Sequence, residues 1–122
     1  MSTDEHAAGG RILVLAGGLC GATGVALSAA AAHLGGAFVG TAAPFLLMHA
    51  PVFLTVGLLG GNSILRTGSL ILLVGLLLFS GDLLARDFLG SRLFPMSAPI
   101  GGTLLIGGWL VMAASALVRP RL

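Results

Sequence analysis

The sequence predicts an all-α integral membrane protein, an antiparallel bundle of four transmembrane helices joined by short loops. Of its 122 residues, 8% are charged and 57% are hydrophobic, and the mean hydropathy is +1.09. A soluble domain carries about 25% charged residues, so this chain has too little polar surface to face water. The apolar residues also gather into four runs, each long enough to cross a bilayer.

The four runs define the predicted spans within a single domain that covers residues 11–122. We place the spans at about residues 12–34, 43–60, 67–86 and 98–118. The polar residues 1–10 before them are expected to form a disordered tail. Pro44 and Pro99 are placed at or near the starts of the second and fourth helices, where a missing N–H costs little.

The arginines indicate the orientation of this multi-pass chain. With four spans, both termini and the turn at 60–66 share one side of the membrane. That side holds four arginines and the other side holds two: Arg11, Arg66, Arg119 and Arg121 against Arg86 and Arg92. Since positive charge concentrates on cytoplasmic loops, both termini are predicted to be cytoplasmic.

Small residues are expected to mark the faces where the helices pack. Lipid gives helices no hydrophobic reason to associate, so close backbone approach must hold them together. The candidates lie at helical spacing in the four spans. They are Gly17, Gly21, Gly24 and Ser28 in the first, Gly57 in the second, Gly68 and Gly75 in the third, and Gly107 and Gly108 in the fourth.

The predicted topology brings polar groups from four stretches to a similar depth, in the outer half of the membrane. We name this set the polar layer; it contains His33, His49, Ser80, Asp82, Arg86, Pro99, Gly101 and Gly102. In one interpretation it is a structural clasp, in which Asp82 pairs with Arg86 one turn on and His49 bonds across helices. In a second it is a proton or small-ligand site, because intramembrane ionisable residues often mark one. A metal site is the third interpretation, but no H-x-x-x-H spacing puts two ligands on one helix.

Other classes of function find little support in the sequence. Ser80 has no G-x-S-x-G context, so no catalytic residue is predicted and no enzyme activity is expected. The glycines of GGRILVLAGG have no strand–turn–helix context, and no cofactor or metal is expected. Six scattered arginines form no cluster, which argues against nucleic-acid binding. Cys20 is the only cysteine and is read as a small apolar residue, and Trp109 is read as a packing residue.

Four segments together resemble a known family. AAAAHLGG, LLMHAPVFLTVGLL, GLLLFSGDLL and SAPIGGTLLIGGWLVMAA occur in this order and spacing. They resemble the domain of unknown function 423 family of small four-helix membrane proteins, which is related to the eukaryotic transmembrane protein 256. The resemblance covers about residues 11–118. It implies a four-span bundle in the bacterial inner membrane, with no settled activity.

The resemblance also bears on the polar layer. His33 falls where the family's Gly-Ala-His segment ends, and His49 falls at its His-Ala pair. Its Pro-Ile-Gly-Gly corresponds to a segment that includes Pro99, Gly101 and Gly102. The chain departs from the family in its alanine-rich first motif, and in Asp82, where serine is expected in many relatives. If serine can serve there, the resemblance implies a hydrogen-bonding role at this position.

These observations lead to two functional hypotheses. The first is a non-enzymatic accessory or assembly component that binds other membrane helices or lipid, within a larger membrane complex or a homo-oligomer. The alternative is a minimal transporter or channel that moves a proton or small solute through the polar layer. The bilayer itself is the partner expected under both hypotheses.

Overall fold

The computed structural model describes residues 3–118, with side chains from residue 8 onward. The chain forms four α-helices, α1 (Thr3–Leu34), α2 (Ala37–Leu59), α3 (Ser63–Phe88) and α4 (Ser97–Ala114), followed by a short 3-10 helix, η1 (Ser115–Leu117). Each α-helix includes a segment long and apolar enough to cross a membrane, and the described part of the chain contains no strand. The predicted all-α, four-span fold is confirmed.

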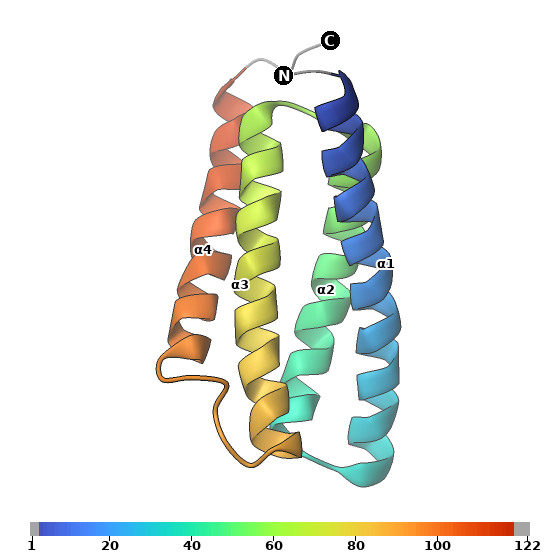
Figure 1. The fold of residues 1–122 in the computed structure, drawn as a ribbon, viewed down its shortest axis with the longest axis vertical. Helices are drawn as coiled ribbons and strands as arrows, with labels where there is room; N and C mark the ends of the chain where they lie inside the picture. The colour runs from blue at the N-terminus through green and yellow to red at the C-terminus, as the bar shows by residue number, and fades with distance from the viewer. Residues whose placement is uncertain (1–2, 119–122) are drawn as a thin grey trace.

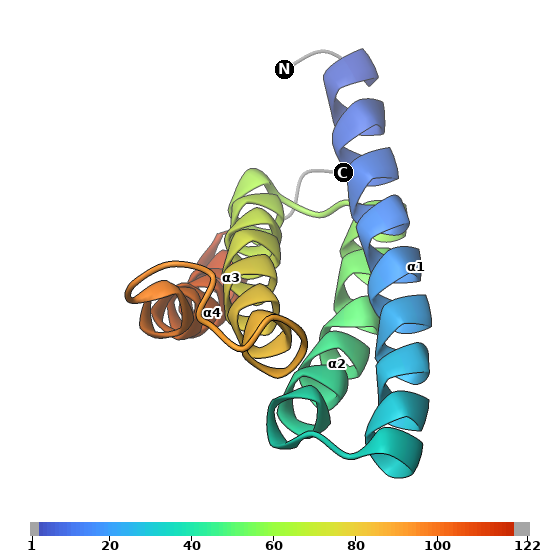
Figure 2. The same ribbon diagram turned by 60° about the horizontal axis from the view of Figure 1, so that its bottom comes forward.

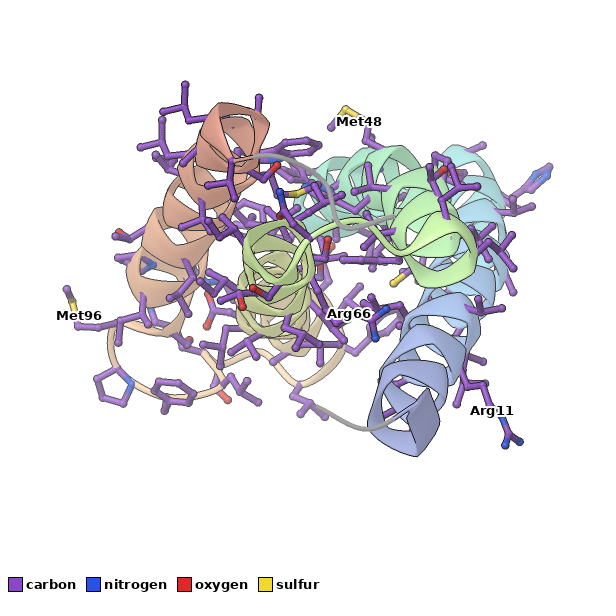
Figure 3. All side chains as sticks on the ribbon, turned by 90° about the horizontal axis from the view of Figure 1, so that it is seen from above. Arg11, Met48, Arg66 and Met96 are labelled. Carbon is purple, nitrogen blue, oxygen red and sulfur yellow. The ribbon has the colours of Figure 1, made fainter. Side chains whose placement is uncertain are left out.

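The helices form two antiparallel hairpins that pack side by side (Figures 1 and 2). Extensive contacts join α1 to α2, α2 to α3, and α3 to α4. Consecutive helices are therefore antiparallel neighbours, as predicted, and α1 and α4 lie at the two outer edges of the assembly (Figure 3). We call the end with the α1–α2 turn and the α3–α4 loop the loop end.

The apolar core lies where α2 and α3 join the two hairpins. Phe53 of α2 and Leu72 and Leu76 of α3 are fully buried there, and Leu13 of α1 reaches them from the first hairpin. Cys20 is also buried in this cluster, with a free thiol.

Glycines bring α1 and α2 into backbone contact. A Cβ atom at Gly17 would stand 2.9 Å from the carbonyl oxygen of Ala50, and one at Gly57 would stand 2.8 Å from that of Gly10. A Cβ atom at Gly24 would meet the Leu47 side chain at 2.7 Å. These positions have no room for a side chain, which is the packing that membrane helices use.

The other two small residues of the α1 stripe contribute less. A Cβ atom at Gly21 would make only an ordinary 3.7 Å contact with Ala50. The hydroxyl of Ser28 donates to the Gly24 carbonyl within the same helix, at 2.8 Å.

A second set of glycines joins α3 to α4. Cβ atoms at Gly68 and Gly75 would lie 3.1 and 2.9 Å from the carbonyl oxygens of Gly108 and Gly101. Gly107 differs from its neighbour, because nothing lies within 4 Å of where its Cβ would stand. Of the two packing glycines predicted in the fourth span, only Gly108 therefore lies at the helix contact.

The α1–α2 turn is shorter than predicted, and the second helix begins earlier. Gly35 and Gly36 have φ angles of 79° and 103°, which glycine adopts without strain, and these two residues complete the turn. The helix therefore starts at Ala37 rather than near residue 43. Pro44 lies inside it, not at its start, and so does Pro51. Membrane helices tolerate such prolines because neighbouring groups satisfy the freed backbone.

The first helix also extends beyond the predicted span. It begins at Thr3, so helical structure covers most of the segment 1–10 that was expected to be a disordered tail. Gly10 is buried, and a Cβ atom there would lie 2.7 Å from the carbonyl oxygen of Gly57. Packing against α2 therefore continues past Arg11 and supports the added turns.

Asn62 ties the start of α3 to the end of α4, at the end of the assembly opposite the loop end. Its Oδ1 accepts the N–H of Leu65 at 2.8 Å and caps α3. Its Nδ2 donates to the carbonyl oxygen of Ser115 at 2.9 Å, where α4 ends. One side chain thus satisfies backbone groups at a helix start and at a helix end.

Replacing Asn62 with alanine removes both bonds. We expect Asn62→Ala to lower the free energy of unfolding by about 1–2 kcal/mol, the usual cost of a lost cap with one further hydrogen bond. Steric trapping in bicelles measures this quantity. Ser63→Ala, at the exposed next residue, should change it by less than about 0.5 kcal/mol. Equal stability of the two variants would show that the tie contributes nothing.

Candidate polar site

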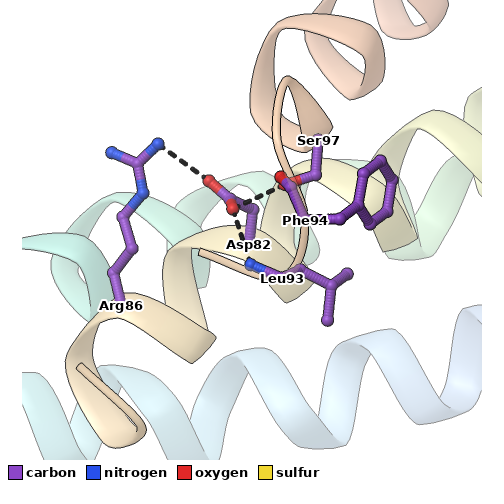
Figure 4. A network of polar contacts seen from close by, with 5 residues as sticks. All are labelled: Asp82, Arg86, Leu93, Phe94 and Ser97. Carbon is purple, nitrogen blue, oxygen red and sulfur yellow. Dashed lines mark hydrogen bonds and ion pairs between the residues drawn. The ribbon is translucent and has the colours of Figure 1, made fainter. Parts of the chain in front are cut away.

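Asp82 is the centre of a buried polar cluster (Figure 4). Its Oδ1 accepts the N–H of Leu93 at 3.0 Å and the hydroxyl of Ser97 at 2.6 Å. Its Oδ2 forms an ion pair with Nη2 of Arg86 at 3.0 Å. The carboxylate is fully buried, and such a charge is stable in apolar surroundings only when it is paired and hydrogen-bonded.

Local structure brings these groups together. Asp82 and Arg86 are one turn apart on α3, so their side chains share a face. Met96 has a φ of 68°, in the left-handed region, and turns the chain into α4. Ser97 is the first residue of α4, and its hydroxyl also lies 2.8 Å from the carbonyl oxygen of Phe94. Asp82 thus fixes the start of α4 from a neighbouring helix.

Asp87 does the same for α2. Its Oδ2 accepts the N–H of Val39 at 2.7 Å. The residue before α2 is Gly36, which has no side chain to cap the helix, so the carboxylate of α3 supplies the missing acceptor. The guanidinium of Arg86 also lies 5.2 Å from the ring centre of Phe38, within cation–π range. The last turns of α3 therefore hold the starts of both α2 and α4.

His49 belongs to a separate polar contact. Its Nδ1 lies 2.7 Å from the carbonyl oxygen of Phe45, and its Nε2 lies 3.2 Å from Nε1 of Trp109 on α4. A carbonyl only accepts and an indole N–H only donates, so these partners assign the proton to Nδ1 and leave Nε2 as the acceptor. His49 is then a neutral imidazole with both ring nitrogens occupied.

His49 lies deeper in the bundle than the depth predicted for the polar layer. It is 12 residues into α2, or about 18 Å from the start of that helix and near the middle of a bilayer. The prediction put it about two turns below the surface because it started the helix at residue 43. The early start at Ala37 moves His49 away from Asp82.

The remaining members of the predicted layer do not join either cluster. His33 is exposed at the end of α1, and Ser80 is buried, with no hydrogen-bond partner for its hydroxyl among the described residues. Pro99 is exposed in the first turn of α4, where its carbonyl accepts the Thr103 hydroxyl at 2.8 Å. The last two members lie at the α3–α4 contact. Gly101 packs closely against the backbone of Phe79, whereas a Cβ atom placed at Gly102 would lie 4.0 Å from the Phe79 ring.

Sequence reasoning missed three contributors to these clusters: Ser97, Asp87 and the indole N–H of Trp109. A serine just before an apolar run that contains proline is a helix-start signal and could have identified Ser97. Asp87 and Trp109 carried no such signal, because their partners lie on other helices. Within the described residues, no group of three His, Cys, Asp or Glu side chains could hold a metal ion.

The arrangement acts chemically as a set of fixed hydrogen bonds. Asp82 binds a backbone amide, a hydroxyl and a guanidinium, and His49 binds a carbonyl and an indole. A proton transfer at either residue would have to break one of these contacts first. Both residues therefore join helices rather than present a free acid or base.

Removing the imidazole tests the α2–α4 contact. We expect His49→Phe to lower the free energy of unfolding by about 1 kcal/mol, because the Trp109 N–H loses its acceptor while the ring volume is largely kept. Trp109 is the single tryptophan, so its emission should also shift when this bond is lost. Phe53→Leu is the matched control, since it alters α2 packing one turn away without touching the bond. Unchanged emission in His49→Phe would contradict the assigned contact.

Comparison with known proteins finds related membrane proteins. The model of the family described as "Protein of unknown function (DUF423)" matches residues 20–102. A "UPF0382 membrane protein" of Haemophilus influenzae (strain ATCC 51907 / DSM 11121 / KW20 / Rd) is 32% identical over 108 residues, which cover 84% of this chain and 87% of that protein. No solved structure matches. A family match over more than half of the chain, together with this relative, identifies this protein as a member of the DUF423 family of membrane proteins.

Proposed function

We propose that the protein is a non-enzymatic membrane component that binds other membrane helices or lipid through its outer helices. The observation that carries this proposal is that the buried ionisable side chains of Asp82 and His49 are engaged within the chain. Asp82 and His49 each direct both of their polar atoms at groups of the same chain. What the molecule offers to its surroundings is an apolar helical surface, with Leu15 and Leu19 on α1 and Leu110 on α4 exposed.

The position of α1 and α4 supports binding at these helices. Each packs extensively against only one other helix, and each lies at an outer edge of the assembly. On α1 the small residues Gly18, Ala22 and Ala26 are exposed, and no atom lies within 4 Å of a Cβ placed at Gly18. A membrane helix could approach this face closely, in the way that α2 approaches the opposite face.

A transporter is less well supported by the same contacts. Proton or solute transfer through Asp82 would require water to reach a carboxylate that has no exposed surface. The ion pair with Arg86 and the bond to Ser97 would have to open in each cycle.

The orientation is part of the proposal. Both termini then lie in the cytoplasm of a bacterial cell. Arg11 and Arg66 lie at the cytoplasmic surface of the inner membrane, and Arg86 and Arg92 lie at the loop end, on the opposite side. The terminal arginines Arg119 and Arg121 add to the cytoplasmic set. Reporter fusions at the C-terminus that are active only in the cytoplasm test this placement.

Two measurements distinguish binding from transport. A photoreactive residue at Ala22 should form a discrete protein adduct in native membranes, whereas one at Leu77, on the exposed face of α3, should label only lipid. Purified protein in liposomes should carry no more proton flux than empty liposomes. A flux that Asp82→Asn abolishes, with the bundle still folded, would overturn the proposal.

A further inference from the structure

The α3–α4 loop presents an unusual surface for a connection outside a membrane helix. Four large apolar side chains in residues 89–96 are between 40 and 77% exposed: Leu89, Leu93, Phe94 and Met96. Phe88, at the end of α3, is exposed beside them. An exposed apolar patch of this kind in water is a binding or aggregation site, so something must cover it.

The hydrogen bonds of Asp82 fix how deep this loop lies. Asp82 precedes the end of α3 at Phe88 by six residues, or about 9 Å along the helix axis. The N–H of Leu93 and the hydroxyl of Ser97 both bind this carboxylate. The chain therefore leaves α3, turns, and comes back alongside it before α4 begins, as Figure 1 shows.

The two carboxylates of α3 give the difference in depth between the neighbouring helices. Asp87 binds Val39 at the start of α2, and Asp82 binds Ser97 at the start of α4. Five residues separate the two carboxylates, so Ser97 lies about 7 to 8 Å farther into the assembly than Val39, which is itself two residues inside α2.

The helix lengths relate this difference in depth to the membrane. The 26 residues of α3 extend about 39 Å, more than a hydrocarbon core of about 30 Å, whereas the 18 residues of α4 extend only about 27 Å. We place this excess length of α3 at the loop end, so that the returning part of the loop falls at the core boundary. Non-helical backbone is tolerated near that depth only where protein satisfies its polar groups, as Asp82 does for Leu93.

We propose that residues 89–96 form an interfacial segment that inserts into the headgroup–acyl boundary of the leaflet at the loop end. Leu93, Phe94 and Met96 contact lipid chains. Arg92, exposed between them and the end of α3, meets the lipid phosphates. This assignment does not depend on the proposed function, because it concerns the bilayer around the chain and not a partner.

Two features select lipid over a soluble partner. Exposed apolar side chains also occur in the first turn of α4, where Ile100 is exposed. Arg92 is also the only charged residue between Asp87 and the C-terminal arginines, and a cation beside an apolar patch complements the anionic boundary of a bilayer.

Single labelled cysteines test the placement. In a Cys20→Ala background, which has no other cysteine, Phe94→Cys and Ser91→Cys are labelled with a small fluorophore and placed in lipid nanodiscs. Both faces of the nanodisc are open to the aqueous reductant dithionite, and quenching is measured in separate nanodiscs that contain spin-labelled phosphatidylcholine and no dithionite. The label at residue 94 should be quenched by the spin-labelled lipid and reduced at least several-fold more slowly than the label at residue 91.

Two outcomes would overturn the assignment. If dithionite reduces both labels at the same rate, the loop lies in water. If the label at residue 94 is protected from dithionite and also from the spin-labelled lipid, protein covers it, either a second copy or another chain. Met96→Cys, at an exposed position of the same patch, repeats the measurement and guards against misfolding of one variant.

Discussion

Replacing Asp82 with alanine is expected to lower the free energy of unfolding by about 3 kcal/mol. The substitution leaves Arg86 without its ion-pair partner and removes the acceptor of the Leu93 amide and the Ser97 hydroxyl. A buried ion pair that loses one member is costly because the other charge remains uncompensated. Steric trapping in bicelles gives the value.

Two further variants separate charge from hydrogen bonding at this site. Asp82→Asn keeps an acceptor for Leu93 and Ser97 but loses the charge, so we expect normal insertion and a smaller loss of about 1–2 kcal/mol. Ser80→Ala is the control on the same helix, because its buried hydroxyl has no hydrogen-bond partner among residues 8–118. If Asp82→Ala is as stable as Ser80→Ala, the cluster does not support the fold.

The second large effect is expected at the α3–α4 glycine contact. A Cβ atom at Gly101 would lie 2.5 Å from the backbone nitrogen of Phe79 and 2.8 Å from the carbonyl oxygen of Gly75. Neither atom can rotate away, so Gly101→Ala must push the two helices apart. We expect it to lower the free energy of unfolding by about 3 kcal/mol, at the upper end for overpacked sites.

The next residue provides a matched control. A Cβ atom at Gly102 would have its nearest neighbour at 4.0 Å, and one at Gly107 would have none within that distance. Alanine at either position should stabilise the helix by up to about 1 kcal/mol, because glycine is the weaker helix former. Gly108→Ala, which meets the backbone nitrogen of Leu72 at 3.0 Å, should destabilise like Gly101→Ala. If alanine changes the free energy of unfolding in the same direction at both glycines of a pair (101 and 102, or 107 and 108), the observed packing is contradicted.

The predictable part of the fold followed from composition and the spacing of small residues. The four spans and the antiparallel order were evident because lipid requires long apolar helices and short loops force neighbours together. Gly75 and Gly57 were recognisable as packing residues because only glycine lets helix backbones meet. Which of Gly107 and Gly108 packs against α3 could not be predicted, because it depends on the rotation of α4 about its own axis.

The polar site was only partly predictable. The pair of Asp82 and Arg86 is local, one turn apart, and sequence spacing was enough to suggest it. The depth of His49 depended on where α2 begins, which is set by the two-glycine turn and by capping from Asp87 on another helix. Contacts of that kind join distant parts of the chain and leave no periodic trace in the sequence.

Two carboxylates of α3 each hold the start of a different helix. Hydrogen exchange of the Leu93 and Val39 amides, followed by NMR in nanodiscs, tests this most directly. In the unmodified chain both amides should be protected, by Asp82 and Asp87 respectively. Asp82→Ala should release Leu93 and leave Val39 protected, and Asp87→Ala should do the reverse. If both amides exchange alike in the two variants, the carboxylates do not act as separate clasps.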